Sequence, residues 1–411
     1  MKKLYLKNPR TRAFSAKITS IVKEHDMYAI ALDKTYFFPS GGGQLADKGT
    51  INRINIIDYI TIDKDVFYAL EQPLNTSIGE HVSCEINFDW RFELMQQHTG
   101  QHILSHSILK TTGLETLSFQ MKDDISQIQI PFTSDLEGLC SSEIHANQIV
   151  FDCVSVETIS ICPSKSEEYN LRKQPLSKHL DKNGEIRIAK IGGFESIPCG
   201  GTHCSNTGEV GLIKIINSKK QSKKLIIDFV CGFRAYRNYH NKIHTLDNIS
   251  TLLTANKNTI TSTVQNILEE LSKQKRQNNQ RTSELLNYKA KDLLAKHEEI
   301  GEVKLVIKGL PELDISELNI LGNKIVEGDN FICVLHNEDG FLLKQSENSS
   351  QDISLIYNEC KNEFDIKGGV TRNSIQGKIF SKTMLQDFIL KITDLIRGEY
   401  GKSTSNTNRK Q

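Results

Sequence analysis

Two short motifs in this chain each place two metal-type ligands four positions apart. The first is His98-Thr-Gly-Gln-His102 and the second is Cys199-Gly-Gly-Thr-His203. Imidazole nitrogens and a thiolate are ligands that zinc prefers, and four of them complete its tetrahedral shell. A lone His-x-x-x-His pair is often only a polar patch on a helix. The prediction of a zinc site therefore depends on the two motifs acting together.

The two motifs need different elements to position them. Residues 92–109 carry apolar side chains at helical spacing, so His98 and His102 are expected on one face of a helix. Pro198 and the glycines after Cys199 exclude a helix and predict a tight loop that bends around the ion. The sequence leaves four roles open for His106, one turn further along the helix. It is an additional ligand, a group that hydrogen-bonds a ligand, a substrate contact or a surface histidine.

The number of ligands that bind at once decides what zinc can do. If all four residues bind, the site is closed, as structural zinc sites are. If one is loose, water takes the fourth position, and the ion can activate it or polarise a carbonyl. The sequence leaves both alternatives open. No Ser-His-Asp order or Walker loop competes for the role of active site.

A glycine run forms the second unusual feature. Gly41, Gly42 and Gly43 remove every side chain from a stretch of backbone, which allows close approach of a ligand. Gln44 follows them and offers an amide beside that backbone. The alternative interpretation is a flexible hairpin turn.

Composition places limits on compartment and partners. The 411 residues carry 51 Lys and Arg against 50 Asp and Glu, so the formal net charge is +1 and any nucleic-acid contact must come from local patches. No apolar run approaches membrane-spanning length and the first residues lack a signal-peptide core, so no membrane association is expected. Nine scattered cysteines without a disulfide-framework spacing favour a reduced, cytoplasmic location.

The pattern of elements predicts an α+β fold built from several domains. A small N-terminal β-barrel or sandwich is expected in the first segment because short β-rich runs alternate with turns. An α+β zinc-containing domain follows, then a long helical hairpin or coiled coil whose two helices join or fray in the polar run 272–284, then an α/β domain. The expected boundaries are 1–90, 91–240, 241–300 and 301–400, with a disordered tail at 401–411.

Taken in order, the motifs resemble one family. Phe38-Pro-Ser-Gly-Gly-Gly-Gln44, Met95-Gln-Gln-His98-Thr-Gly-Gln-His102 and Pro198-Cys-Gly-Gly-Thr-His203 look like the editing domain of alanyl-tRNA synthetase. They are most similar to its free-standing relatives, the AlaX-type trans-editing proteins. The resemblance covers roughly residues 10–235. It extends more weakly to a DHH-associated C-terminal domain through the helical region and a loop at 367–377, as in the long form of the family.

The resemblance implies a zinc-dependent hydrolase that removes serine, and often glycine, from mischarged tRNA(Ala). It implies His98, His102, Cys199 and His203 as the zinc ligands and places Gly42, Gly43 and Gln44 beside the 3′-terminal adenosine and the ester. Ser118 and Gln120 stand where relatives discriminate between amino acids, although this stretch aligns only loosely. No aminoacylation core precedes these motifs, so the chain is not expected to activate alanine.

Lysines and one arginine are the predicted contacts to tRNA phosphates. They are Lys219, Lys220, Lys223 and Lys224 in one patch, for which a solvated lysine turn is the alternative, and Lys367, Arg372 and Lys378 in the C-terminal loop. The helical region and C-terminal domain are also expected to form a homodimer. Two other functions remain open. One is a non-catalytic tRNA-binding protein with structural zinc, and the other is a deacylase of another mischarged tRNA such as Ser-tRNA(Thr).

Overall fold

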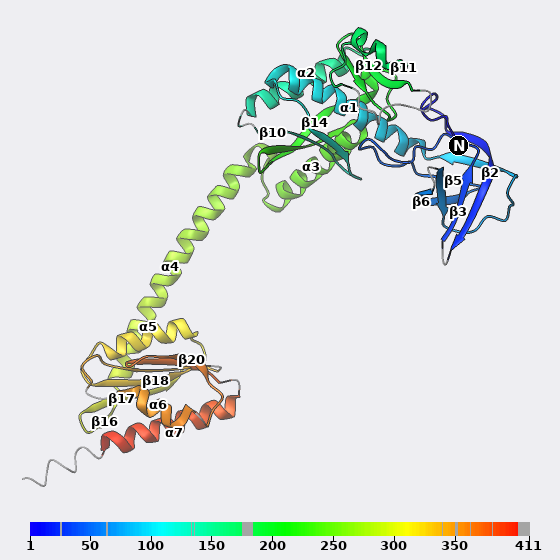
Figure 1. Ribbon diagram of the computed structural model, residues 1–411. Coiled ribbons are helices and arrows are strands. Elements are labelled where there is room, and N and C mark those ends of the chain that lie inside the picture. Colours follow the sequence, from blue (N-terminus) through cyan, green and yellow to red (C-terminus); the bar gives the residue numbers. More distant parts are fainter. Residues whose placement is uncertain are drawn as a thin grey trace, which may run out of the picture. The chain divides into compact units, whose positions relative to one another are not determined.

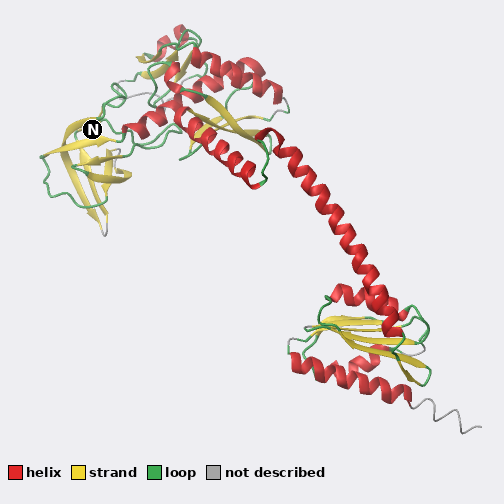
Figure 2. Ribbon diagram, turned by 180° about the vertical axis from the view of Figure 1, so that it is seen from behind, coloured by secondary structure: helices red, strands yellow, loops and turns green. Residues whose placement is uncertain are grey.

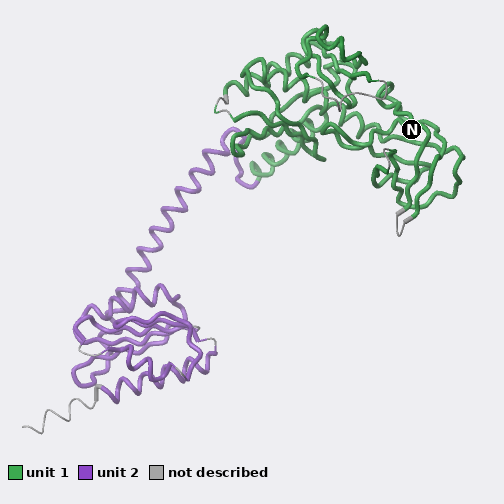
Figure 3. The backbone as a smooth tube through the Cα atoms, viewed as in Figure 1, with its two compact units in different colours: residues 1–251 green, residues 252–411 purple. Residues whose placement is uncertain are grey.

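The structure is a computed structural model that describes residues 1–24, 27–62, 65–132, 134, 136–174, 184–338, 340–349, 352–361, 363–379 and 381–401. The chain divides into two compact units, Met1–Thr251 and Leu252–Gln411, which Figure 3 colours separately. The mixture of helices and sheets confirms the α+β class. The tail predicted to be disordered lies, apart from its first residue, outside the described residues.

The first unit begins with a closed β-barrel, which settles the choice between barrel and sandwich. Its strands follow the order β2 (Ala13–Glu24), β3 (Met27–Leu32), β7 (Asp65–Leu70), β6 (Ile54–Ile62), β5 (Gly49–Ile51) and β8 (His81–Ile86). The short strands β1 (Lys2–Lys3) and β4 (Lys34–Thr35) pair in parallel beside it. Alternate side chains such as Ile18, Ile30 and Cys84 point inward and form a separate apolar core.

Helix α1 (Phe88–Thr112) follows the barrel directly. Asn87 caps its first turn by accepting a hydrogen bond from the Trp90 amide, and Gly113 ends it in the left-handed conformation at φ 72°. Most of α1 is buried around its whole circumference, so polar residues such as Gln97 and Thr99 are buried as well. The helix is therefore the centre of the unit and not a one-sided surface helix.

Two antiparallel sheets and a second helix surround α1 (Figure 1). One sheet has the order β14 (Ile213–Gln221), β15 (Lys224–Cys231), β10 (Ser126–Pro131) and β9 (Ser118–Met121). The other contains β11 (Val156–Ile161), β12 (Ile186–Ile191) and β13 (Glu195–Pro198). Helix α2 (Leu136–Phe151) packs on α1, and a shared core joins Met95 and Leu104 to Ile128 and Phe229.

Two helices occupy the expected helical region, but their boundary differs from the prediction. Helix α3 (Gly232–Leu252) belongs to the first unit except for its last residue, and α4 (Ile260–Leu294) belongs to the second. The break falls at 253–259, where Thr254 adopts φ 49°, and the polar run 272–284 is uninterrupted helix. The reason is that Lys, Gln, Arg and Glu favour the helix without any apolar face. The hairpin and coiled coil stay predictions.

The second unit is a sheet covered by helices on both faces (Figure 2). The strand order is β16 (Glu298–Ile300), β17 (Val303–Gly309), β18 (Phe331–His336), β19 (Gly340–Gln345), β21 (Ser374–Lys378) and β20 (Lys367–Val370). The end of α4 and α5 (Ile315–Val326) share one core with the sheet. Helices α6 (Ile353–Lys361) and α7 (Lys382–Gly401) share the other.

The segment 367–377, predicted as a loop, is instead most of a β-hairpin. Strands β20 and β21 pair in antiparallel register, with Gly368 opposite Gly377. A Cβ atom on Gly368 would collide with the Gln376 carbonyl, so the glycines permit close strand pairing. No described helix combines the length and apolar character needed to cross a membrane.

Candidate metal centre

Four side chains from two elements meet inside the first unit. His98 and His102 come from α1, whereas Cys199 and His203 come from the loop that follows β13. One ligand atom of each lies within 4.8 Å of all the others. Cys199 Sγ is 3.3 Å from His98 Nε2 and 3.3 Å from His203 Nε2. The structure thus brings together the four residues predicted as zinc ligands.

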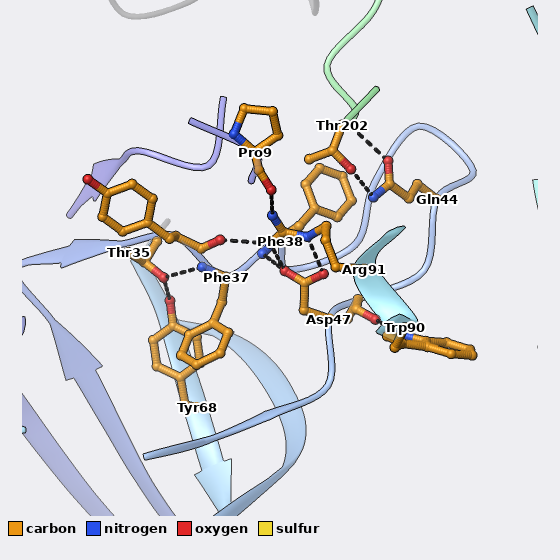
Figure 4. Close-up of polar contacts among 12 residues, drawn as sticks. Pro9, Thr35, Phe37, Phe38, Gln44, Asp47, Tyr68, Trp90, Arg91 and Thr202 are labelled. Carbon is orange, nitrogen blue, oxygen red and sulfur yellow. Dashed lines mark hydrogen bonds and ion pairs between the residues drawn. The ribbon is translucent and has the colours of Figure 1, made fainter. Parts of the chain in front are cut away.

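Gln44 fixes which nitrogen of His98 faces the cluster. Its Oε1 accepts a hydrogen bond from His98 Nδ1 at 2.8 Å. The same Oε1 accepts from the Thr202 amide at 2.9 Å, while Gln44 Nε2 donates to Thr202 Oγ1 at 2.8 Å (Figure 4). A carbonyl oxygen can only accept, so His98 must carry its proton on Nδ1 and keep Nε2 free for an ion. Gln44, a residue that is 2% exposed, therefore orients the ring of a candidate metal ligand.

The other ligands have supports of their own. Thr99 Oγ1 lies 3.4 Å from His203 Nδ1, which leaves His203 Nε2 directed at Cys199. Arg187 donates from Nη1 to the carbonyl oxygens of Cys199 and Gly201, both at 2.8 Å. These bonds hold the loop in its bent conformation and bring a guanidinium beside the thiol.

The electrostatics of the cluster favour neutral imidazoles. Burial lowers the pKa of His98 to about 3, with the Arg187 charge as a further cause. Burial also lowers the pKa of His102 and His203 well below the usual value. Burial raises the pKa of Cys199, and the Arg187 charge works against that rise. Neutral imidazole is the form that binds a metal ion, and an ion nearby would deprotonate the thiol.

The residues present fit a zinc ion. Within the described part of the chain, both ring nitrogens of His102 are buried without a hydrogen-bond partner. Two unsatisfied nitrogens in a buried site are costly unless a ligand satisfies one of them. Three imidazoles and one thiolate form a tetrahedral zinc set, and four protein ligands would fill it.

A pocket of about 420 Å³ opens onto this cluster. Gly42, Ser118 and Phe119 line it together with His98, His102 and Cys199 of the cluster. Gly42 adopts φ 61° with open space where a Cβ atom would stand. Gly43 instead packs against β9, where its carbonyl accepts from the Met121 amide at 2.8 Å. Gln120 is exposed on β9 and is not among the described residues that line the pocket.

A buried ion pair connects the barrel to α1. Arg91 Nε donates to Asp47 Oδ1 at 2.6 Å, and its Nη2 contacts the other carboxylate oxygen. The same guanidinium donates to the carbonyl oxygens of Pro9 and Tyr36, both at 2.7 Å (Figure 4). Because Asp47 also accepts from the Phe38 amide, the pair holds both ends of the glycine loop against α1.

The predicted tRNA contacts lie at two exposed sites. Lys219, Lys220, Lys223 and Lys224 form the end of the hairpin between β14 and β15. In the second unit, Lys367 stands opposite Lys378 across the β20–β21 pair, and Arg372 is exposed in the turn. Like charges directly opposite each other weaken a sheet, so an anion beside this hairpin would be stabilising.

Sequence reasoning missed four charged residues around the pocket. Arg172 and Lys173 line it, Glu195 pairs with Arg172, and Arg187 donates to the backbone of the loop that carries Cys199. The sequence left the role of His106 open. Its Nδ1 lies 3.2 Å from Glu195 Oε2. A signal existed for two of them, because Arg187 and Glu195 interrupt otherwise β-like runs just before Cys199.

Comparisons with known proteins show the family to which the chain belongs. Residues 186–226 match the family described as "Threonyl and Alanyl tRNA synthetase second additional domain". The chain is 30% identical over 403 residues to "Alanyl-tRNA editing protein AlaX-L" of Pyrococcus horikoshii, covering 93% of this chain and 95% of that protein. It is 25% identical over 406 residues to an "Alanine--tRNA ligase" of Methanococcus maripaludis, covering 95% of this chain but 43% of the ligase. The C-Ala domain of Aquifex aeolicus alanyl-tRNA synthetase aligns with 25% of this chain and 97% of that domain at 13% identity, with a TM-score of 0.22.

Proposed function

The chain belongs to the AlaX-type alanyl-tRNA editing proteins, and we propose on this premise that it hydrolyses the ester of mischarged tRNA(Ala). Serine is the proposed amino acid, with glycine as a second. One observation carries the proposal. Three residues of the four-residue cluster, His98, His102 and Cys199, line the same pocket as Gly42, so a bound ion and a side-chain-free backbone would face one cavity.

The reaction needs little beyond positioning, because an aminoacyl ester is already activated. Water attacks the carbonyl carbon, the bond to the ribose oxygen breaks, and the ribose oxygen takes a proton. Zinc, when bound, would orient the substrate or act as a Lewis acid. His98, His102, Cys199 and His203 would hold it, and Gln44 would keep His98 in the binding tautomer.

Selection of serine over alanine depends on one hydroxyl group. A pocket that hydrogen-bonds this hydroxyl rejects alanine because its own polar groups would be left unpaired. Ser118 lines the pocket and is our candidate for that contact. Gln120 is the weaker candidate because it lies outside the pocket lining. The backbone at Gly42 is proposed to approach the terminal adenosine.

Phosphate contacts are assigned to the exposed basic sites described above. We propose that the hairpin lysines and the Lys367–Lys378 pair bind the tRNA backbone. A homodimer through α3, α4 and the second unit is part of the same proposal. Exposed apolar residues on both helices, such as Leu246 at 41% and Leu271 at 64%, support it.

A deacylation assay tests the proposal. Purified protein is given Ser-tRNA(Ala), Gly-tRNA(Ala), Ala-tRNA(Ala) and Ser-tRNA(Thr) in parallel, with chelator-treated protein as control. We expect fast release of serine from tRNA(Ala) and slow release of alanine. Removal of the metal by the chelator should abolish activity. Binding without turnover would indicate a tRNA-binding protein with structural zinc. Preference for Ser-tRNA(Thr) would assign the protein to another mischarged tRNA.

A further inference from the structure

Arg172 lies in the wall of the metal pocket, and neither the ligand set nor the glycine loop accounts for it. It lines the cavity together with His98 and His102. Its side chain is 6% exposed, and within the described part of the chain its buried Nη2 has no hydrogen-bond partner. An unsatisfied buried donor is costly, and each such group in a folded protein calls for an explanation. An acceptor oxygen of a bound ligand would satisfy this donor.

Strand β13 holds Arg172 firmly. The backbone amide of Arg172 donates to the Ser196 carbonyl at 2.9 Å, and its Nε donates to Glu195 Oε1 at 2.6 Å. The other oxygen of Glu195, a residue that is 3% exposed, lies 3.2 Å from His106 Nδ1 on α1. Since β13 runs directly into Cys199, one strand fixes both the guanidinium and the ligand loop.

We propose that Arg172 is a catalytic residue whose Nη2–H donates to the carbonyl oxygen of the aminoacyl ester, and that Glu195 is its positioning residue. This inference rests on the deacylase function proposed above. When water adds to the carbonyl carbon, the carbonyl oxygen gains the negative charge. A donor fixed in place beforehand stabilises that charge without reorganising. The charge returns into the carbonyl as the bond to the ribose oxygen breaks.

The surroundings of Arg172 favour the carbonyl oxygen over a backbone phosphate. Its positive charge is already paired with Glu195, so it offers a directed donor more than a net charge. A phosphodiester is strongly hydrated and is usually met by exposed cations, such as the hairpin lysines. Arg172 lines the same pocket as His98, His102 and Cys199, where the ester must lie for the reaction to occur, and its unpartnered Nη2 is buried.

The test compares Arg172→Ala, Arg172→Lys and Glu195→Gln with wild type on Ser-tRNA(Ala). Arg53→Ala, which removes an exposed barrel arginine, is the matched control. Single-turnover rate, KM and zinc content are measured for each variant. We expect Arg172→Ala to lower the rate constant about 100- to 1,000-fold, with KM and zinc little changed. Added guanidinium ion should restore part of the rate to Arg172→Ala and not alter wild type.

The positioning role of Glu195 has its own readout. Glu195→Gln should slow the wild-type protein but cause no further loss in the Arg172→Ala background, because both changes act through one contact. If Arg172→Ala fails to fold, Arg172→Lys carries the test, since it keeps a cation but loses the Nη2 geometry.

Several outcomes would overturn the assignment. They are an unchanged rate in both Arg172 variants, a loss confined to KM, a loss that follows zinc content, or additive effects of Glu195→Gln and Arg172→Ala. If wild type itself released no amino acid from any charged tRNA, the proposed function would fail instead. That result is distinct from a failure of Arg172.

Discussion

Gln44 and His98 come from different parts of the first unit, yet Gln44 Oε1 accepts a hydrogen bond from His98 Nδ1 at 2.8 Å. The bond links the loop at 41–44 to a proposed metal ligand on α1. It gives this loop a second role besides its proposed approach to the substrate, because the loop also sets the tautomer of His98.

Gln44→Ala is expected to weaken zinc binding about 10- to 100-fold without removing a ligand, because His98 loses the acceptor that orients its ring. Competition with a chromophoric chelator measures the affinity. Gln97→Ala is the control, since its amide is equally buried but bonds the Cys231 backbone. Equal losses in both variants, or no loss in Gln44→Ala, would contradict the assigned role.

The two glycines after Cys199 should respond differently to alanine. A Cβ atom on Gly201 would collide with the His98 ring, whereas nothing lies within 4 Å of one on Gly200. Gly201→Ala is therefore expected to lose zinc and Gly200→Ala to retain about one ion per chain. Elemental analysis of the two purified variants decides the matter. Retention of zinc by both would mean that the loop can move away from His98.

Gly42→Val should abolish deacylation while zinc stays bound. The β-branched side chain would enter the pocket, and φ 61° would strain any residue with a Cβ atom. Gly79→Val controls for strain alone, because Gly79 adopts φ 98° in the barrel away from the pocket. Activity and zinc content are measured together. Full activity in Gly42→Val would show that the substrate does not approach this backbone.

Arg91→Met is expected to destabilise the first unit by about 3–5 kcal/mol, because it strands the buried Asp47 carboxylate. Urea unfolding followed by the fluorescence of the single tryptophan, Trp90, reports on this region. Arg10→Met removes the Arg10–Glu209 pair, in which the Arg10 side chain is 47% exposed, and should cost about 1 kcal/mol or less. Similar losses for both variants would contradict a special role for the buried pair.

Cys162 should be the fastest thiol to react with iodoacetamide at neutral pH. It is exposed, and hydrogen bonds from Ser164 lower its pKa, so more thiolate is present below the ordinary thiol pKa. Its labelling rate should rise as pH rises through that lowered pKa. Burial raises the pKa of Cys84 and Cys204 to about 12, which should leave them unlabelled. Peptide mass spectrometry measures each site, and Ser164→Ala should slow Cys162 selectively.

The sequence alone determined the features that depend on local spacing. His98 and His102 stand four positions apart on a helix, and the glycines after Cys199 allow only a loop, so the ligand types and their elements could be predicted. The short alternating runs before α1 likewise predicted a small β structure, because a period of two needs no knowledge of distant residues.

Tertiary structure decided everything that depends on contacts between distant segments. Gln44 meets His98 and Thr202 across 54 and 158 positions, and Arg91 meets Asp47 across 44, which no local pattern encodes. The polar run 272–284 predicted the point where the helices join or fray, but the break lies at 253–259. The polar residues of that run favour the helical backbone, so α4 continues through them. In the sequence, Arg172 resembles any surface arginine. Only its buried ion pair with Glu195 in the tertiary structure makes it a candidate for a role in the reaction.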